Sequence, residues 1–229
     1  MRIGGLQKLT LLDYPDKMAC TVFTAGCNFR CPFCHNAGLI PAEGGAPLLR
    51  QEEVLAFLDR RRGLLDGVCV TGGEPLLQPD LEDFLREVKK RGYRIKLDTN
   101  GSLPDRLRRL TEKGLADYVA MDIKTAPETY SEACGVPADR SALEESRKLL
   151  LEGRVAYEFR TTVVRGIHSR EKLRRAAEWI QGAEKYCLQP FQKATPVPQP
   201  GLEAFSPEEM KEFLQLVRPY VKQAELRGI

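Results

Sequence analysis

Three cysteines in one short segment form the most reactive group of side chains in this sequence. Cys27, Cys31 and Cys34 have the spacing C-x-x-x-C-x-x-C, and Gly26 and Pro32 favour tight turns around them. Thiolates with this spacing can hold iron–sulfur clusters or a zinc ion. Three thiolates cannot fill the four corners of a cubane 4Fe–4S cluster, so one iron would stay open to a substrate or cosubstrate.

A zinc ion held by three cysteines and one histidine is the alternative chemistry for this segment. His35 directly follows Cys34 and is therefore awkwardly placed to ligate the same tetrahedral ion. Seven cysteines, an odd number, in a chain of 229 residues argue against a secreted disulfide scaffold. Four of them are widely separated and are interpreted as small buried hydrophobic residues: Cys20, Cys69, Cys134 and Cys187.

Glycine-rich and polar motifs follow three apolar, β-like runs further along the chain. Thr71 to Pro75 reads Thr-Gly-Gly-Glu-Pro, and its two glycines let the backbone approach a ligand closely. Asp98 to Gly101 and Met121 to Lys124 end the next two runs. Each motif alone is also typical of an ordinary turn or a solvated carboxylate. Their shared position at successive strand ends favours a common ligand site.

The elements that must position these motifs are short strands that alternate with amphipathic helices. The expected strands are 17–24, 67–71, 93–98, 117–123, 155–164 and 186–191; the expected helices are 51–62, 81–90, 102–114, 141–152, 169–181 and about 206–226. This alternation predicts a parallel α/β sheet, either doubly wound or an incomplete barrel of about six βα units. In both folds, ligands bind at the C-terminal ends of the strands.

Length and composition indicate a single domain over residues 1–229 of ordinary globular type. Hydrophobic residues make up 42% and charged residues 29%, and no repeat or linker interrupts the sequence. The net charge of 35 − 32 = +3 is too small to argue for a nucleic-acid or membrane partner. Residues 1–17 lack the apolar core of a signal peptide, and no run approaches the roughly 18 apolar residues of a membrane span. We therefore expect a cytoplasmic protein with reduced thiols.

The cysteine loop from Gly26 to Asn36, together with the Gly72-Gly73 motif, resembles the radical S-adenosylmethionine (SAM) superfamily. The His35-Asn36 ending of the loop resembles the glycyl-radical-enzyme activating enzymes. Residues 9–17 and 23–27 are most similar to the anaerobic ribonucleoside-triphosphate reductase activating proteins. The resemblance covers nearly the whole chain and implies a partial (βα)6 TIM-like barrel of the radical SAM type.

The resemblance also implies an activity. Cys27, Cys31 and Cys34 would hold one 4Fe–4S cluster that reductively cleaves SAM to a 5′-deoxyadenosyl radical, which abstracts a glycine α-hydrogen in a partner enzyme. The implied partners are a glycyl radical enzyme, here anaerobic ribonucleotide reductase, and an electron donor of the flavodoxin or ferredoxin type. Residues 37–50 contain no cysteine, so no second cluster domain is expected.

The resemblance implies that SAM, rather than an acid–base pair, completes the site. The residues that match family SAM contacts are Phe33, Gly72, Gly73, Glu74, Asp98, Thr99, Asp122, Lys124, Arg160, His168 and Gln189. A monovalent cation is also expected near Asp98 and Asp122. Two of these residues have simpler interpretations: Arg160 as a salt-bridge residue inside a barrel, and His168 as an ordinary loop residue.

Three other functions remain open at this stage. The first is a radical SAM enzyme for a small molecule, similar to the 7-carboxy-7-deazaguanine synthases. The second is an activator of pyruvate formate-lyase, although residues 13–16 read Asp-Tyr-Pro-Asp where that family has Asp-Gly-Pro-Gly. The third is a zinc-stabilised binding module without catalysis.

Overall fold

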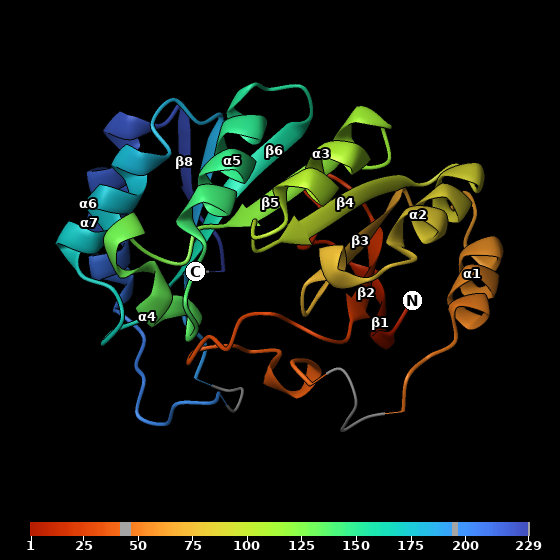
Figure 1. The fold of residues 1–229 in the computed structure, drawn as a ribbon, viewed down its shortest axis with the longest axis horizontal. Helices are drawn as coiled ribbons and strands as arrows, with labels where there is room; N and C mark the ends of the chain where they lie inside the picture. The colour runs from red at the N-terminus through yellow and green to blue at the C-terminus, as the bar shows by residue number, and fades with distance from the viewer. Residues whose placement is uncertain (42–46, 194–196, 229) are drawn as a thin grey trace.

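The computed structural model describes residues 1–41, 47–193 and 197–228. These residues build one eight-stranded sheet in which the strands lie side by side in sequence order (Figure 1). The strands are β1 (Ile3–Thr10), β2 (Ala19–Thr24), β3 (Gly67–Gly72), β4 (Arg94–Thr99), β5 (Tyr118–Asp122), β6 (Ala156–Val163), β7 (Lys185–Pro190) and β8 (Gln223–Leu226). β1 is antiparallel to β2, and every later neighbouring pair is parallel.

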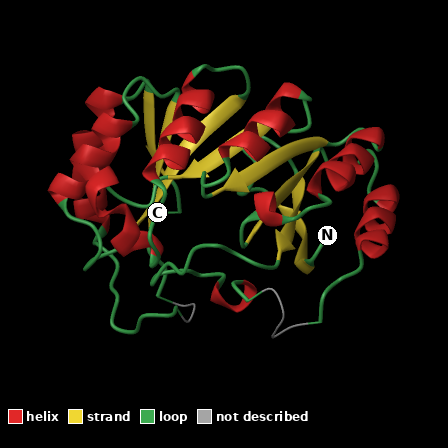
Figure 2. Ribbon diagram, in the orientation of Figure 1, coloured by secondary structure: helices red, strands yellow, loops and turns green. Residues whose placement is uncertain are grey.

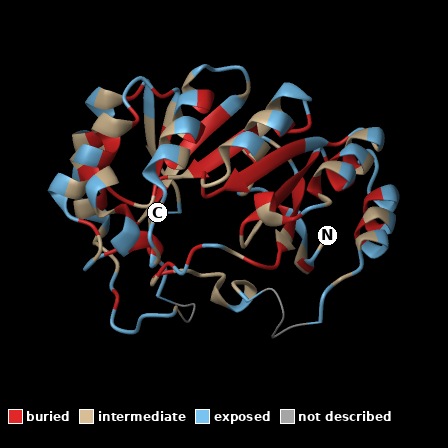
Figure 3. Ribbon diagram, in the orientation of Figure 1, coloured by how far each residue is buried: buried red, intermediate tan, exposed pale blue. Residues whose placement is uncertain are grey.

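Helices lie along the outer face of this curved sheet (Figure 2). They are α1 (Gln51–Arg60), α2 (Leu81–Lys90), α3 (Pro104–Glu112), α4 (Tyr130–Cys134), α5 (Arg140–Leu151), α6 (Arg170–Trp179) and α7 (Pro207–Val217), with 3-10 turns at Ala37–Leu39, Pro75–Leu77, Pro127–Thr129 and Arg218–Tyr220. α2 shows why they pack there. Leu81, Phe84, Leu85 and Val88 recur at helical spacing and are fully buried. Figure 3 shows the buried residues concentrated on the strands and on the inner sides of the helices.

The six central strands agree with the expected ones, whereas the two edge strands were not expected. The helix predicted over about 206–226 was too long, because α7 ends at Val217. Pro219 lacks the N–H that a continuing helix needs, and the chain passes through a 3-10 turn into β8. β1 was missed because Gly4 and Gly5 interrupt its apolar pattern.

β1 and β8 are the two edges of the sheet, and the strand pairing that the described residues show does not join them. The sheet is therefore an incomplete barrel, as expected, with an open side between its first and last strands. The C-terminal ends of β2 to β7 lie at one end of this barrel, since these strands are parallel. No helix among the described residues has both the length and the apolar character needed to cross a membrane.

Candidate functional site

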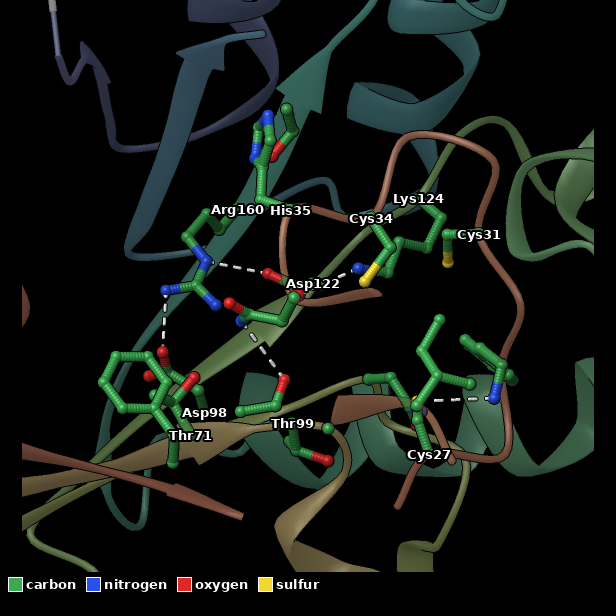
Figure 4. Close-up of a pocket in the computed structure, with 18 of the residues that line it drawn as sticks. Cys27, Cys31, Cys34, His35, Thr71, Asp98, Thr99, Asp122, Lys124 and Arg160 are labelled. Atoms are coloured by element: carbon green, nitrogen blue, oxygen red, sulfur yellow. Dashed lines mark hydrogen bonds and ion pairs between the residues drawn. The ribbon is translucent and has the colours of Figure 1, made fainter. Parts of the chain in front are cut away.

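A cavity of about 360 Å³ lies at the C-terminal ends of the strands, against the loop that follows β2 (Figure 4). Its lining includes all three cysteines of that loop and nine of the eleven residues that the resemblance assigned to SAM: Phe33, Gly72, Gly73, Asp98, Thr99, Asp122, Lys124, Arg160 and Gln189. Parallel strands bring these residues together because each motif follows a strand that ends at this rim. Glu74 and His168 lie outside the lining.

The three loop cysteines suit a cluster better than a single metal ion. Their Sγ atoms do not all lie within 4.8 Å of one another. Three thiolates around one zinc, with bonds of about 2.3 Å, must approach to about 3.8 Å, whereas the thiolates of a cubane lie further apart because each is bonded to a different iron. Burial raises the pKa of all three thiols, to about 12 for Cys31, while the charge of Lys124 acts in the opposite direction on each. The donor set therefore fits a 4Fe–4S cluster with one open iron.

All seven cysteines are free thiols. The four outside the loop are buried within the fold, as expected from their scattered positions: Cys20, Cys69, Cys134 and Cys187.

The glycine motif at the end of β3 lets the start of the cysteine loop pass very close to it. The Gly73 N–H donates to the Thr24 carbonyl at 2.8 Å, and the Glu74 N–H donates to the Gly26 carbonyl at 2.9 Å. A Cβ on Gly73 would lie 2.1 Å from the Gly26 carbonyl oxygen, and Gly72 has a φ of +109°. Both positions therefore require glycine for this close approach.

Three further hydrogen bonds hold the cysteine loop over the barrel. The Asn100 amide, after β4, donates to Asn28 Oδ1 at 2.9 Å, and Asn28 Nδ2 donates to the Ser102 hydroxyl at 2.8 Å. On the other side, the Arg30 N–H donates to the Cys134 carbonyl at the end of α4, at 2.8 Å. These hydrogen bonds thus connect the loop to β3, β4 and α4.

Charged side chains cross the inner wall of the cavity. Arg160 donates from Nε to Asp122 at 2.7 Å and from a terminal nitrogen to Asp98 at 3.0 Å (Figure 4). Lys124 Nζ lies 2.9 Å from Asp122, and the buried Lys96 pairs with Asp98. Burial alone raises the pKa of both carboxyl groups, but the charges of Arg160 and the two lysines lower it below the usual value. Both aspartates are therefore ionised at neutral pH.

Arg160 thus makes the barrel salt bridges that its simpler interpretation predicted, and it also lines the cavity. Its guanidinium lies between Asp98 and Asp122, where the resemblance placed a monovalent cation. Two positive side chains, Lys124 and Arg160, and three negative ones, Asp13, Asp98 and Asp122, line the cavity, a formal net charge of 2 − 3 = −1. The cavity therefore offers groups of both signs to a ligand that carries both charges.

Glu74 connects two of the motifs from behind the cavity wall. Its fully buried carboxylate accepts hydrogen bonds from Leu76 N at 3.0 Å, Thr99 Oγ1 at 2.9 Å and Asn100 N at 2.7 Å. Burial raises its pKa to about 7, against the opposing effect of these three donors. Glu74 therefore holds the ends of β3 and β4 together.

His168 is buried behind the cavity, in the turn after β6. Its ring contacts the Lys124 carbonyl through Nε2 at 2.8 Å and the Val164 N–H through Nδ1 at 3.0 Å. Both contacts are to backbone atoms, so the ring does not face the cavity.

Several lining residues were not among those assigned to SAM or the cluster from the sequence, although some of them stand within the motifs. They include Asp13, Thr21, Phe23, His35, Asn36, Thr71, Asn100 and Thr162. Thr21 and Phe23 on β2, like Arg160 and Thr162 on β6, are two residues apart and so share the inner face of a strand. This two-residue spacing could have predicted from the sequence which strand residues face the cavity. Asp13 has no such signal, because it reaches the cavity from the turn between β1 and β2.

Comparisons with known proteins agree with this site. A protein of Methanocaldococcus jannaschii, provisionally named a glycyl-radical enzyme activating enzyme, is 27% identical over 99% of this chain and 96% of its own length. The 7-carboxy-7-deazaguanine synthase of Methanopyrus kandleri is 29% identical over 63% of this chain and 66% of its own. A solved domain of the pyruvate-formate lyase-activating enzyme from Bacteroides vulgatus has a similar fold, with a TM-score of 0.58 at 20% identity, over 71% of this chain and 99% of that one.

The family model of the radical SAM superfamily matches residues 21–180, from the middle of β2 to the end of α6. This range contains the three cysteines, the glycine motif and the charged strand ends that line the cavity. The chain therefore belongs to the radical SAM superfamily of enzymes.

Proposed function

We propose that this chain activates a partner protein by generating a glycyl radical in it. The open side of the barrel carries this proposal. A second cleft, of about 260 Å³, shares Asp13, His35, Arg160, Thr162 and Gln189 with the main cavity. It is also lined by Leu12 before β2 and by Arg227 and Gly228 after β8, so it lies at the two edges of the sheet. Such a side opening suits a substrate that is part of a protein chain.

The end-to-end likeness to the Methanocaldococcus jannaschii protein supports the same proposal, since that protein's name describes an activating enzyme. Exposed apolar residues near the side cleft also suit a protein partner. Leu11 and Leu12 are 66% and 77% exposed.

A 4Fe–4S cluster held by Cys27, Cys31 and Cys34 would supply the electron that cleaves SAM at its open iron. The chain's own residues bind and orient the substrate. Lys124 and Arg160 offer positive charge for the SAM carboxylate, and the backbone at Gly72-Gly73 can approach the SAM ammonium. Phe33 and the buried wall behind it exclude water, which protects a reactive radical.

A monovalent cation at Asp98 and Asp122 would have to displace the guanidinium of Arg160 toward the SAM carboxylate. We propose this only for the SAM-bound state. The dissociation constant of SAM, measured in sodium, potassium and tetramethylammonium salts at equal ionic strength, tests it. Equal constants in all three would exclude the cation.

We propose anaerobic ribonucleotide reductase as the partner, because residues 9–17 and 23–27 resemble its activating proteins. A flavodoxin or ferredoxin is the proposed electron donor. The seven free thiols suit a reducing compartment.

Electron paramagnetic resonance tests the partner. The reconstituted protein is incubated without oxygen with SAM, a reductant and either anaerobic ribonucleotide reductase or pyruvate formate-lyase. We expect a glycyl radical signal on the reductase. A signal on the lyase alone would reassign the partner, and a signal on neither would contradict an activating function.

The likeness to a 7-carboxy-7-deazaguanine synthase supports a second candidate, a radical SAM enzyme for a small molecule. Release of 5′-deoxyadenosine distinguishes the two. A small-molecule enzyme produces it catalytically with the free substrate and needs no partner protein.

A further inference from the structure

The turn after β6 places the imidazole of His168 against the backbone of another strand end. His168 is 5% exposed, and its ring is held at both nitrogens. Nδ1 lies 3.0 Å from the Val164 nitrogen within its own turn. Nε2 lies 2.8 Å from the carbonyl oxygen of Lys124, which follows β5.

These two contacts fix the protonation of the ring. The Val164 N–H is a donor, so Nδ1 must accept and carries no proton. The Lys124 carbonyl is an acceptor, so Nε2 must carry the proton and donate. His168 is therefore a neutral Nε2–H tautomer in which each nitrogen has one backbone partner.

Lys124 is held from a second direction as well. The Tyr130 hydroxyl of α4 accepts from the Lys124 N–H at 3.2 Å and donates to the Asp122 carbonyl at 3.0 Å. The Lys124 backbone thus has His168 at its carbonyl and Tyr130 at its N–H. With its backbone fixed in this way, the Lys124 side chain is directed to Asp122 and into the cavity.

The same imidazole also supports the cysteine loop. Phe33, between Cys31 and Cys34, meets the His168 ring edge-on, with ring centroids 6.1 Å apart and an interplanar angle of 69°. An edge-to-face contact of this kind fixes the ring orientation of both partners. One side chain therefore contacts both the loop that carries the metal ligands and the strand end that carries Lys124.

We infer that His168 is a positioning residue that fixes Lys124 and the cysteine loop relative to each other, and that it does not bind SAM itself. The inference concerns the superfamily site and does not depend on which partner protein is activated.

Two substitutions separate the two hydrogen bonds of the ring. In His168→Asn, the amide oxygen can replace Nδ1 and accept from Val164, but nothing reaches the Lys124 carbonyl. In His168→Gln, the amide nitrogen can replace Nε2 and donate to Lys124, while the Val164 bond is lost. Ser169→Ala is the matched control. It removes the N-cap of α6 beside His168, where the Ser169 hydroxyl accepts from Lys172 N, and leaves the Lys124 contact intact.

Amide hydrogen exchange on the cluster-free protein gives a readout that does not depend on activity. We expect the peptide covering 121–126 to exchange about tenfold faster in His168→Asn than in the wild type, because the Lys124 carbonyl loses its buried donor, while His168→Gln stays within about threefold. The peptide covering 31–35 should exchange faster than in the wild type in both variants, because both lose the ring that meets Phe33. Ser169→Ala is expected to stay within about threefold of the wild type in both peptides.

The dissociation constant of SAM for the reconstituted protein is expected to follow the same order, with His168→Asn about tenfold weaker than His168→Gln. Equal exchange of the peptide covering 121–126 in the two variants, or faster exchange of it in His168→Gln, would overturn the inference. Unchanged exchange in both with equal losses of SAM affinity would instead show that the ring contacts SAM directly. Glycyl radical formation is not needed for any of these measurements.

Discussion

Glu74 shows how a motif residue can serve the site without facing it. Its carboxylate is buried, and its three donors come from the segment after β3 and from the end of β4. If the carboxyl group of Glu74 is protonated, its O–H becomes a donor and can no longer accept from one of its present donors, Leu76, Thr99 or Asn100. Protonation therefore costs one of these three hydrogen bonds. Burial nevertheless raises the pKa of Glu74 to about 7, so the desolvation cost exceeds what these donors recover.

The raised pKa of Glu74 makes the stability of the fold depend on pH. The unfolded chain ionises this carboxyl near pH 4.5, whereas the folded chain keeps its proton up to about pH 7. The folded state therefore binds the additional proton in this window, and the free energy of unfolding falls as pH rises through it, by roughly 3 kcal/mol. Glu74→Gln imitates the neutral carboxyl group and should remove this pH dependence of the free energy of unfolding. Urea unfolding at pH 5 and pH 8 measures the difference between the two proteins.

A similar pH difference in wild type and Glu74→Gln would show that other groups cause it. The wild type could instead be more stable than the variant by the same amount at pH 5 and at pH 8. Glu74 would then be ionised in the folded chain at both pH values.

The three loop cysteines and the four scattered ones should differ sharply in metal content. Cys27→Ala, Cys31→Ala or Cys34→Ala each removes one ligand, and we expect less than about a tenth of the wild-type iron after anaerobic reconstitution. Cys20→Ala, in the buried interior of β2, is the matched control and should keep its iron and its SAM cleavage. Iron and sulfide analysis and the yield of 5′-deoxyadenosine are the measurements. Equal iron in all four variants, or one zinc per chain, would rule out the cluster.

At the scale of elements, the junction between β3 and the cysteine loop is the tightest contact of the site. Gly73→Ala would place a methyl group 2.1 Å from the Gly26 carbonyl oxygen. This oxygen belongs to the backbone, so no side-chain rotation can relieve the overlap. The loop must then move away from β3, which breaks the Gly73–Thr24 and Glu74–Gly26 hydrogen bonds. We expect a loss of about 2–4 kcal/mol in the free energy of unfolding and a large loss of SAM affinity.

Gly38→Ala is the control for this substitution. Gly38 lies in the same connection between β2 and α1 and needs no positive φ, and no atom of the described residues lies within 4 Å of the place that a methyl group would take there. The variant should be within about 0.5 kcal/mol of the wild type. If the two alanine variants unfold at the same urea concentration and bind SAM equally, the close approach at Gly73 does not limit the site.

Elements differ in how well the sequence predicts them, and the difference follows their environment. β3 is a continuous apolar run, Val68-Cys69-Val70, because a central parallel strand is buried on both faces. β1 and β8 are edge strands with exposed residues and glycine or charge in their runs, so they have no comparable signal.

Residues at strand ends were also predictable, since parallel strands bring their C-terminal ends to one rim. Asp98, Asp122 and Arg160 line the cavity as the motifs indicated. Glu74 and His168, which were also predicted to contact SAM, lie outside the cavity lining: Glu74 accepts from Thr99 Oγ1 and two backbone N–H groups, and the ring nitrogens of His168 contact backbone groups. The neighbours of a polar side chain depend on how far each turn folds back, and local sequence does not encode that distance.

At the scale of the whole molecule, the C-terminal segment holds the open barrel in shape. Arg227, directly after β8, forms a two-pronged ion pair with Glu158 of β6, with both distances 2.7 Å. Glu158 is fully buried and also accepts from the Tyr118 hydroxyl of β5 at 3.1 Å. Burial alone raises the pKa of Glu158, but its bonds to Arg227 lower it to about 2. The guanidinium of Arg227 thus neutralises the buried negative charge of Glu158 inside the barrel.

Removing Arg227 should therefore destabilise the molecule more than its surface position suggests. Arg227→Met leaves the buried Glu158 carboxylate without its cation, and we expect a loss of about 3 kcal/mol at pH 7. The double variant Glu158→Gln/Arg227→Met removes both charges and should recover most of that loss. Lys222→Ala is the control, since it breaks an exposed ion pair with Glu184 just before β8 and should cost less than about 0.5 kcal/mol.

The pH dependence of the same variants gives an independent test of this ion pair. Because the pKa of Glu158 is lower in the folded chain than its usual value of 4.5, the pair stabilises the fold fully above pH 4.5. That contribution is lost as pH falls toward about 2. Wild type and Arg227→Met should therefore converge in stability below pH 4, measured by urea unfolding. A constant gap between them from pH 7 to pH 3 would show that Arg227 acts by packing its apolar stem, and that β8 closes the barrel without charge pairing.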